Sequence, residues 1–138
     1  MLMDPGIERR RLVIIVEDSE TCAITLQIAL ETIPGIELRV ASSGPRALTM
    51  LAGYHDGIAA VITDLQLPGM SGLDLLARLK AEPHLANVPV LVVSGDSDPG
   101  LPRKVLAQGA DAFFTKPYSP LEVRRKLEQL LKCPTKQS

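Results

Sequence analysis

The sequence of 138 residues has few aromatic residues, few cysteines and no excess of charge of either sign. Only 3% of the residues are aromatic and the net charge is −1, which argues against nucleic-acid binding, because that needs stacking side chains and a basic surface. The two cysteines, Cys22 and Cys133, form no disulfide framework, so we expect a reducing, cytoplasmic setting. The first apolar run, 12–16, is too short for a signal peptide or a membrane span.

Hydrophobic residues, by contrast, make up 46% of the sequence. With so few aromatic residues, the core must be built from Leu, Val, Ile and Ala. A chain of this length buries roughly two thirds of its extended surface around a single core. We therefore predict one domain over residues 11–132, with flexible tails at 1–10 and 133–138.

Short apolar runs alternate with segments that have helical spacing. Three of the runs lack the alternation of a half-exposed strand, which indicates strands that are covered on both faces, as in a parallel sheet. Apolar residues such as Ile24, Ile28 and Ala29 mark the first helix, and the fourth helix, within 99–108, should be short because prolines and a glycine lie near its start. This order predicts a doubly wound α/β fold. The five runs are 12–16, 36–41, 58–62, 88–93 and 112–114.

Polar side chains directly follow four of these runs. They are Glu17 and Asp18 after the first, Asp64 after the third, Ser94 after the fourth and Lys116 after the fifth. Because the carboxyl ends of parallel strands share one edge of the sheet, we expect all five side chains to meet in one cleft. Carboxylates about 4 Å apart near a protein surface repel each other by roughly 4 kcal/mol per pair, so the cleft should attract a cation.

The chemistry of these side chains indicates phosphoryl transfer. Hard oxygen ligands that leave room for water and phosphate favour Mg²⁺ over Ca²⁺. Lys116 offers the positive charge that phosphoryl oxygens need, Ser94 offers a hydroxyl, and Asp64 can serve as the covalent acceptor. Each residue taken alone also has a structural interpretation, because Glu17 and Asp18 could cap a helix, Ser94 could form a turn and Lys116 could be solvated.

Four motifs occur in order after four predicted strands: Glu17-Asp18, the stretch 64–72 (DLQLPGMSG), Ser94-Gly95 and Thr115-Lys116-Pro117. In order and spacing they resemble the response-regulator receiver domains of two-component signalling, including the chemotaxis regulators. The resemblance extends over about 11–131. It implies a flavodoxin-like sheet of five parallel strands in the order 2-1-3-4-5, with helices on both faces, and a cis peptide bond between Lys116 and Pro117.

The resemblance also implies roles for individual residues. Asp64 would be phosphorylated from a histidine kinase, a phosphotransfer protein or a small phosphodonor. Asp18, Asp64 and the main-chain carbonyl of Gln66 would bind Mg²⁺. Glu17 replaces a more frequent aspartate, and we expect its longer side chain to reach the metal through water.

Phosphorylation replaces one negative charge on Asp64 by about two, which we expect to change the shape of the domain. Ser94 and Lys116 should move toward the new group, and Phe113, at the family's aromatic position, should turn inward. A downstream protein target would then bind the face formed by the fourth helix, the fifth strand and the fifth helix. The basic run 124–126 on the last helix is interpreted as a solvated face.

We expect the module to reverse its own phosphorylation. Gln66 and Asp96, two positions after Asp64 and Ser94, should flank the water that attacks the acyl phosphate. The resemblance therefore implies a regulatory phosphoacceptor that phosphorylates and dephosphorylates itself, not an enzyme that acts on separate substrates.

Two alternatives stay open. A receiver-like scaffold would bind partners without control by phosphorylation, although Asp18, Asp64 and Lys116 are all present. A haloacid-dehalogenase-like phosphatase also uses an aspartate after a strand, but it needs a second acid where this chain has Gln66. The sequence leaves open a weak dimer, the cognate kinase and whether the chain is part of a larger regulator.

Overall fold

The computed structural model describes residues 11–54 and 57–132, so the tails predicted at 1–10 and 133–138 lie outside the described residues, as does Cys133. Strands and helices alternate along the described part. None of its helices is long and apolar enough to cross a membrane. The elements are β1 (Arg11–Val16), α2 (Glu20–Leu30), β2 (Ile36–Ala41), α3 (Gly44–Ala52), β3 (Ile58–Asp64), α4 (Gly72–Ala81), β4 (Val90–Ser94), α5 (Leu101–Ala107), β5 (Ala112–Thr115) and α6 (Pro120–Lys132).

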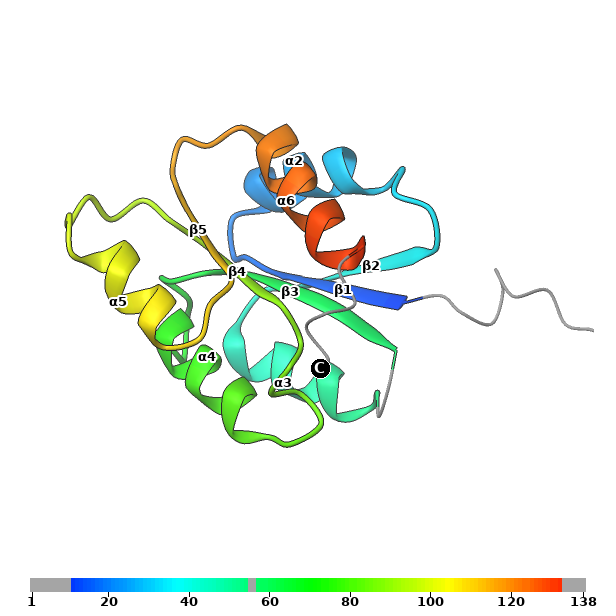
Figure 1. Cartoon of the computed structure of the whole chain (residues 1–138), viewed down its shortest axis with the longest axis horizontal. Coiled ribbons are helices and arrows are strands. Elements are labelled where there is room, and N and C mark those ends of the chain that lie inside the picture. The colour runs from blue at the N-terminus through cyan, green and yellow to red at the C-terminus, as the bar shows by residue number, and fades with distance from the viewer. Residues whose placement is uncertain (1–10, 55–56, 133–138) are drawn as a thin grey trace, which may run out of the picture.

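The five strands form one parallel sheet in the order β2-β1-β3-β4-β5, as Figure 1 shows. Strands β1, β3 and β4 are buried along nearly their whole length, whereas the edge strand β2 is mostly half-buried. Non-alternating apolar runs are expected where helices cover both faces of a strand. The predicted flavodoxin-like fold and strand order are therefore confirmed.

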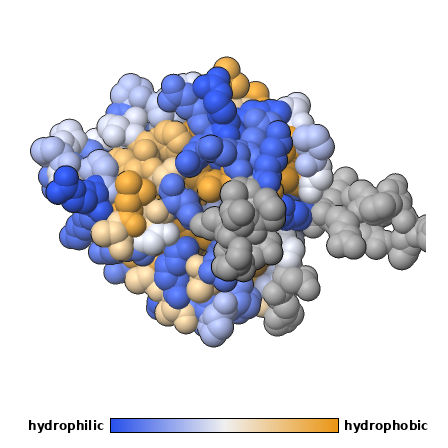
Figure 2. All heavy atoms as spheres, viewed as in Figure 1, coloured by the Kyte–Doolittle hydropathy of each residue, from blue (hydrophilic) through white to orange (hydrophobic). Residues whose placement is uncertain are grey.

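Helices cover both faces of the sheet (Figure 1). Helices α2 and α6 pack on one face, where Leu26 and Leu30 share a core with Val123 and Leu127. Helices α3, α4 and α5 pack on the other face around a second core. Figure 2 shows that hydrophobic side chains also reach the surface among hydrophilic ones.

The first helix, α2, presents a different face to the sheet from the one its apolar spacing suggests. The spacing of Ile24 and Ile28 correctly predicts a helix, but these side chains are 49% and 62% exposed. The buried residues of α2 are Ala23, Leu26 and Leu30. Since α2 carries apolar side chains on more than one side, its periodicity alone does not identify the buried stripe.

The helix after β4, α5, has only seven residues, which confirms the prediction of a short fourth helix. Its N-cap residue is Gly100, which offers no side-chain hydrogen bond, and a proline occupies the first turn. The preceding helix, α4, begins with Ser71, whose hydroxyl accepts a hydrogen bond from the Asp74 N–H at 3.0 Å. The helix nearest the end of β4 is therefore the more weakly anchored of the two at its start.

Candidate functional site

The register of the sheet places two acidic residues side by side at the carboxyl ends of β1 and β3. Val16 of β1 pairs with Thr63 of β3, so the next residues, Glu17 and Asp64, stand at the same level. Both side chains are buried, with 3% and 5% of their residue surface exposed. Buried carboxylates need a cation or hydrogen-bond donors, because burial without partners is costly.

Lys116, which directly follows β5, supplies that cation. Its Nζ lies 2.6 Å from Oδ2 of Asp64 and 3.4 Å from Oε1 of Glu17. Burial alone would lower the pKa of Lys116, but the hydrogen bond and the charge of Asp64 hold that pKa above the ordinary value of a lysine. Lys116 is therefore charged at neutral pH and bridges the two carboxylates.

Glu17 has both a structural and a site-facing role. Its Oε2 accepts a hydrogen bond from the N–H of Ser19 at 3.1 Å, at the start of α2, while Oε1 faces Lys116. Burial raises the pKa of Glu17, and the charge of Asp64 adds to this effect, although Ser19 and Lys116 oppose it. The N-cap of α2 is Ser19, whose hydroxyl accepts a hydrogen bond from the N–H of Cys22, so the interpretation of Glu17 as the helix cap is wrong and its carboxylate belongs to the site.

Both oxygens of the Asp64 carboxylate have fixed partners. Lys116 holds Oδ2, and the N–H of Gln66 donates to Oδ1 at 2.9 Å. The main-chain carbonyl of Asp64 accepts from the hydroxyl of Thr63 at 2.9 Å. The carboxylate therefore has one defined orientation at the end of β3.

Ser94 lies at the same edge and is fully buried. It pairs with Thr115 in the sheet, and its carbonyl accepts a hydrogen bond from the N–H of Lys116 at 2.8 Å. Its Oγ accepts from the N–H of Asp96 at 3.0 Å, so the hydroxyl also closes a turn. The peptide bond between Lys116 and Pro117 is cis, as expected.

The other predicted residues are more exposed. Asp18, Gln66 and Asp96 have exposed side chains in the segments that follow β1, β3 and β4. Phe113 of β5 is half-buried and packs against the core beneath α3, α4 and α5. Within 11–54 and 57–132, no three His, Cys, Asp or Glu side chains are grouped so that they could hold a metal ion.

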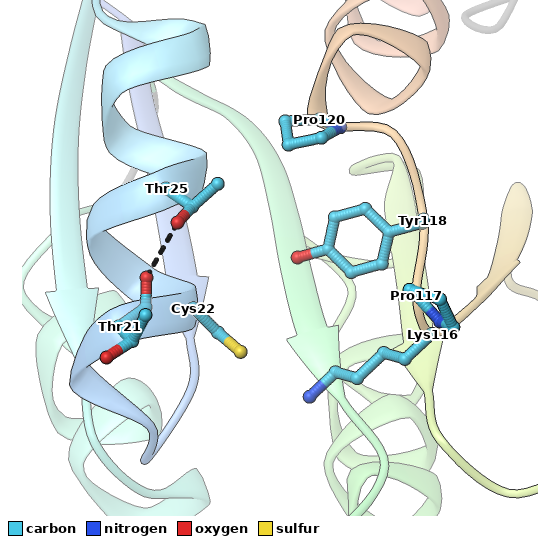
Figure 3. Close-up of a pocket in the computed structure, with 7 residues that line it drawn as sticks. All are labelled: Thr21, Cys22, Thr25, Lys116, Pro117, Tyr118 and Pro120. Atoms are coloured by element: carbon cyan, nitrogen blue, oxygen red, sulfur yellow. Dashed lines mark hydrogen bonds between the residues drawn. The ribbon is translucent and has the colours of Figure 1, made fainter.

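A pocket of about 410 Å³ opens between the start of α2 and the segment after β5. Figure 3 shows the amine of Lys116, the ring of Tyr118 and the thiol of Cys22 pointing into the space between these two segments. Burial raises the pKa of the Tyr118 hydroxyl to about 12. No sequence pattern predicts this pocket, although the Lys116-Pro117 motif forms one of its walls. Its lining residues are Thr21, Cys22, Thr25, Lys116, Pro117, Tyr118 and Pro120.

A buried acid pair and a lysine at the carboxyl edge of a doubly wound parallel sheet define a class of α/β domains whose sites lie at the topological switch point. Within that class, the family model described as the response regulator receiver domain matches residues 13–128. The chain belongs to the response regulator receiver domain family, which makes it a signalling domain of the two-component type.

Individual relatives agree with this assignment. The sensory transduction protein RegX3 of Mycolicibacterium smegmatis is 38% identical over 121 residues, which cover 87% of this chain and 50% of RegX3. The two-component response regulator ORR7 of Oryza sativa subsp. indica is 35% identical over 89 residues, which cover 64% of this chain and 43% of ORR7. The chain thus spans half or less of these two relatives.

A solved structure shows the same fold. The crystal structure of a putative response regulator from Chloroflexus aurantiacus superposes with a TM-score of 0.80 and 28% sequence identity. The match covers 90% of this chain and 99% of that chain. The arrangement of strands and helices described above is therefore that of known receiver domains.

Proposed function

We propose that this receiver domain is switched by phosphorylation of Asp64. The observation that carries the proposal is a buried carboxylate at a strand end, with Lys116 Nζ 2.6 Å from one oxygen and the Gln66 N–H 2.9 Å from the other. An oxygen of Asp64 would attack the phosphorus, and the bond to the donor would break with its electron pair leaving on the donor. Lys116 would balance the charge on the transferred oxygens.

The proposed cofactor is Mg²⁺. Carboxylates of Glu17, Asp18 and Asp64, with the carbonyl of Gln66, form a set of hard oxygen donors, which is the set that this ion prefers. Mg²⁺ commonly uses one or two carboxylates and keeps several waters, so it does not require a closed group of three acids. When bound, Mg²⁺ would neutralise charge on the phosphoryl oxygens. We assign Asp18 and Asp64 as direct ligands and Glu17 as a ligand through water.

We propose a histidine kinase or a phosphotransfer protein as the donor, with small phosphodonors as substitutes. Family membership supports this choice, because receiver domains generally interact with histidine kinases and with downstream targets. Such a donor would place the reaction in the cytoplasm. A scaffold that ignores phosphorylation has less support, because Asp18, Asp64 and Lys116 are all retained.

The proposed output face consists of α5, β5 and α6. Ser94 and Lys116 would move toward the phosphoryl group, and Phe113 would turn inward. Three observations support this route: the main-chain hydrogen bond from Lys116 to Ser94, the half-buried position of Phe113 and the short α5 without a side-chain cap. A downstream protein would bind the changed face.

Reversal by hydrolysis is the last part of the proposal. Gln66 and Asp96 would orient the attacking water, which would displace the Asp64 carboxylate from phosphorus. Their exposed side chains, in the segments after β3 and β4, support access from solvent. The lifetime of the phosphorylated state would therefore depend on both residues.

The experiment that tests the proposal is intact-mass spectrometry after incubation with acetyl phosphate and Mg²⁺. Native chain should gain the mass of one phosphoryl group, and hydroxylamine should remove it, as expected of an acyl phosphate. Asp64→Asn should gain nothing, whereas Asp74→Asn, which changes an exposed aspartate of α4, should behave like the native chain. Absence of the added mass on native chain would favour the scaffold.

A further inference from the structure

We propose that Gly72 is a positioning residue for Asp64, an inference that rests on the proposed phosphorylation of Asp64. Gly72 is the first residue of α4 and is buried. A Cβ atom at this position would lie 2.3 Å from the carbonyl oxygen of Asp64 and 2.6 Å from the Cα of Leu65. Both contacts are with main chain, so a side chain at position 72 would push the backbone of the phosphoacceptor segment away.

Backbone conformation does not explain the glycine. Gly69, three residues earlier, has a φ of 79°, in the left-handed region that favours glycine, but Gly72 does not have a positive φ. Helix propensity gives no explanation either, because alanine is more favourable than glycine within a helix. The close approach of α4 to the end of β3 is therefore the feature that requires Gly72.

The close approach of Gly72 affects the position of the Asp64 carboxylate, because Gly72 lies against the peptide unit between Asp64 and Leu65. The N–H of Gly72 donates to the carbonyl of Leu65 at 2.7 Å, and the hydroxyl of Thr63 donates to the carbonyl of Asp64 at 2.9 Å. The next residue, Gln66, holds Oδ1 of Asp64 through its N–H at 2.9 Å. A shift of the 64–65 peptide would therefore move both the Asp64 side chain and the donor that orients it.

The distance by which the Asp64 backbone must move determines how much phosphorylation slows. Raising a separation of 2.3 Å to a normal van der Waals distance requires a movement of about 1 Å. A misplacement of about 1 Å in a positioned reaction can cost about 100-fold in rate. We expect Gly72→Ala to slow phosphorylation about tenfold or more, while the buried side chains of Leu75, Leu76 and Leu79 keep α4 on the sheet.

The chain contains a matched control at Gly44. Gly44 is the buried first residue of α3 and follows the N-cap Ser43, just as Gly72 follows the N-cap Ser71. The three atoms nearest to a Cβ at Gly44 all belong to the side chain of Met70, at 3.0–3.2 Å, and none of them is a main-chain atom. Contacts of this length are relieved by a shift of a few tenths of an ångström in Met70, so Gly44→Ala reproduces the change of residue type with a much smaller displacement and no direct contact with Asp64.

Two measurements on the full chain test the inference. One is the rate of phosphorylation by acetyl phosphate with Mg²⁺, and the other is the NMR amide resonance of Gln66 without any phosphodonor. Gly72→Ala should slow the reaction and shift the Gln66 resonance, whereas Gly44→Ala should leave both near their native values. A native rate and an unshifted resonance in Gly72→Ala would overturn the inference, and so would equal losses in both variants.

The resonance also separates this inference from the proposed function. If native chain takes up no phosphate, the proposed function fails, while a Gln66 shift confined to Gly72→Ala still supports the positioning contact. If Gly72→Ala does not fold, Thr63→Val becomes the deciding variant, because it removes the other contact to the Asp64 carbonyl at a fully buried position. A slower reaction with a shifted Gln66 resonance then supports the inference, and native values of both overturn it.

Discussion

At the scale of single residues, the site depends on how one ammonium group is shared. Lys116 serves two buried carboxylates and lies closer to Asp64, at 2.6 Å, than to Glu17, at 3.4 Å. A phosphoryl group on Asp64 would bring further oxygens to the same Nζ, and charge-assisted hydrogen bonds of this kind are strong. Phosphorylation would therefore redistribute the contacts of Lys116 and weaken its hold on Glu17.

The buried Glu17 predicts a pH dependence of stability. Because burial raises its pKa above the ordinary 4.5, the folded protein binds this proton more tightly than the unfolded chain does. The contribution of Glu17 to stability is therefore complete below about pH 4.5 and is lost as the pH rises through the folded pKa. Glu17→Gln should abolish this loss, so the variant should gain stability relative to native chain as the pH rises from 4.5.

Urea denaturation at a series of pH values from 4.5 upward, without divalent ions, measures the difference in free energy of unfolding between Glu17→Gln and native chain. Glu20→Gln, at an exposed position at the start of α2, is the matched control for the change of residue type. A Glu17→Gln variant that loses stability relative to native chain as the pH rises would show that pairing with Lys116 outweighs burial.

At the scale of secondary-structure elements, Arg124 of α6 forms hydrogen bonds that connect this helix to the end of α2. Arg124 donates to the carbonyl of Ala29 at 2.9 Å, also contacts the hydroxyl of Thr32, and pairs with Glu128 at 3.4 Å. The interpretation of the run 124–126 as a solvated face is therefore wrong for Arg124. Sequence spacing could not reveal the contacts with Ala29 and Thr32, because these two residues lie far away in the chain, at the end of α2 and just after it.

This contact predicts a difference between neighbouring arginines. Arg124→Ala should lower the free energy of unfolding by about 1–2 kcal/mol, because it leaves the carbonyl of Ala29 and the hydroxyl of Thr32 without their donor. Arg125→Ala, at an exposed position of the same helix, should change it by less than about 0.5 kcal/mol. Urea denaturation of the two variants side by side gives the comparison, and equal effects would contradict the role of Arg124.

The sequence predicts an element well where local apolar pattern determines it, and less well where tertiary packing does. Apolar runs predicted the five strands, and the observed bounds of β2 agree with the predicted run, 36–41. Helix α2 was predicted as a helix, but its buried face was not, since Ile24 and Ile28 are apolar and yet exposed. Which side of such a helix meets the sheet depends on tertiary packing.

At the scale of the whole molecule, the site lies where the sheet leads into helices on both of its faces. Glu17 precedes α2, Ser94 precedes α5, and Lys116 precedes α6, while the segment after Asp64 leads into α4. The convergence of these residues could be predicted, because parallel strands end at one edge. The contact of Gly72 with Asp64 could not, because it depends on how the chain returns from β3 to α4.

This arrangement predicts where a signal should spread. Binding of the phosphoryl analogue beryllium fluoride with Mg²⁺ should shift NMR resonances of Phe113 and of α5, in addition to those at the site. Resonances of α3, which supplies none of the proposed site residues, provide the internal control. Shifts confined to the residues around Asp64, with Phe113 and α5 unchanged, would refute the proposed coupling to the output face.

Asp64, held by Lys116 and Gln66, is the residue that we expect to carry the phosphoryl group. Borohydride reduction of the phosphorylated chain, followed by peptide sequencing in the mass spectrometer, locates an acyl phosphate directly, because the modified aspartate becomes homoserine. If Asp64 carries the phosphoryl group, position 64 should become homoserine while position 18 remains aspartate. Homoserine at position 18, or at any site other than 64, would contradict this assignment.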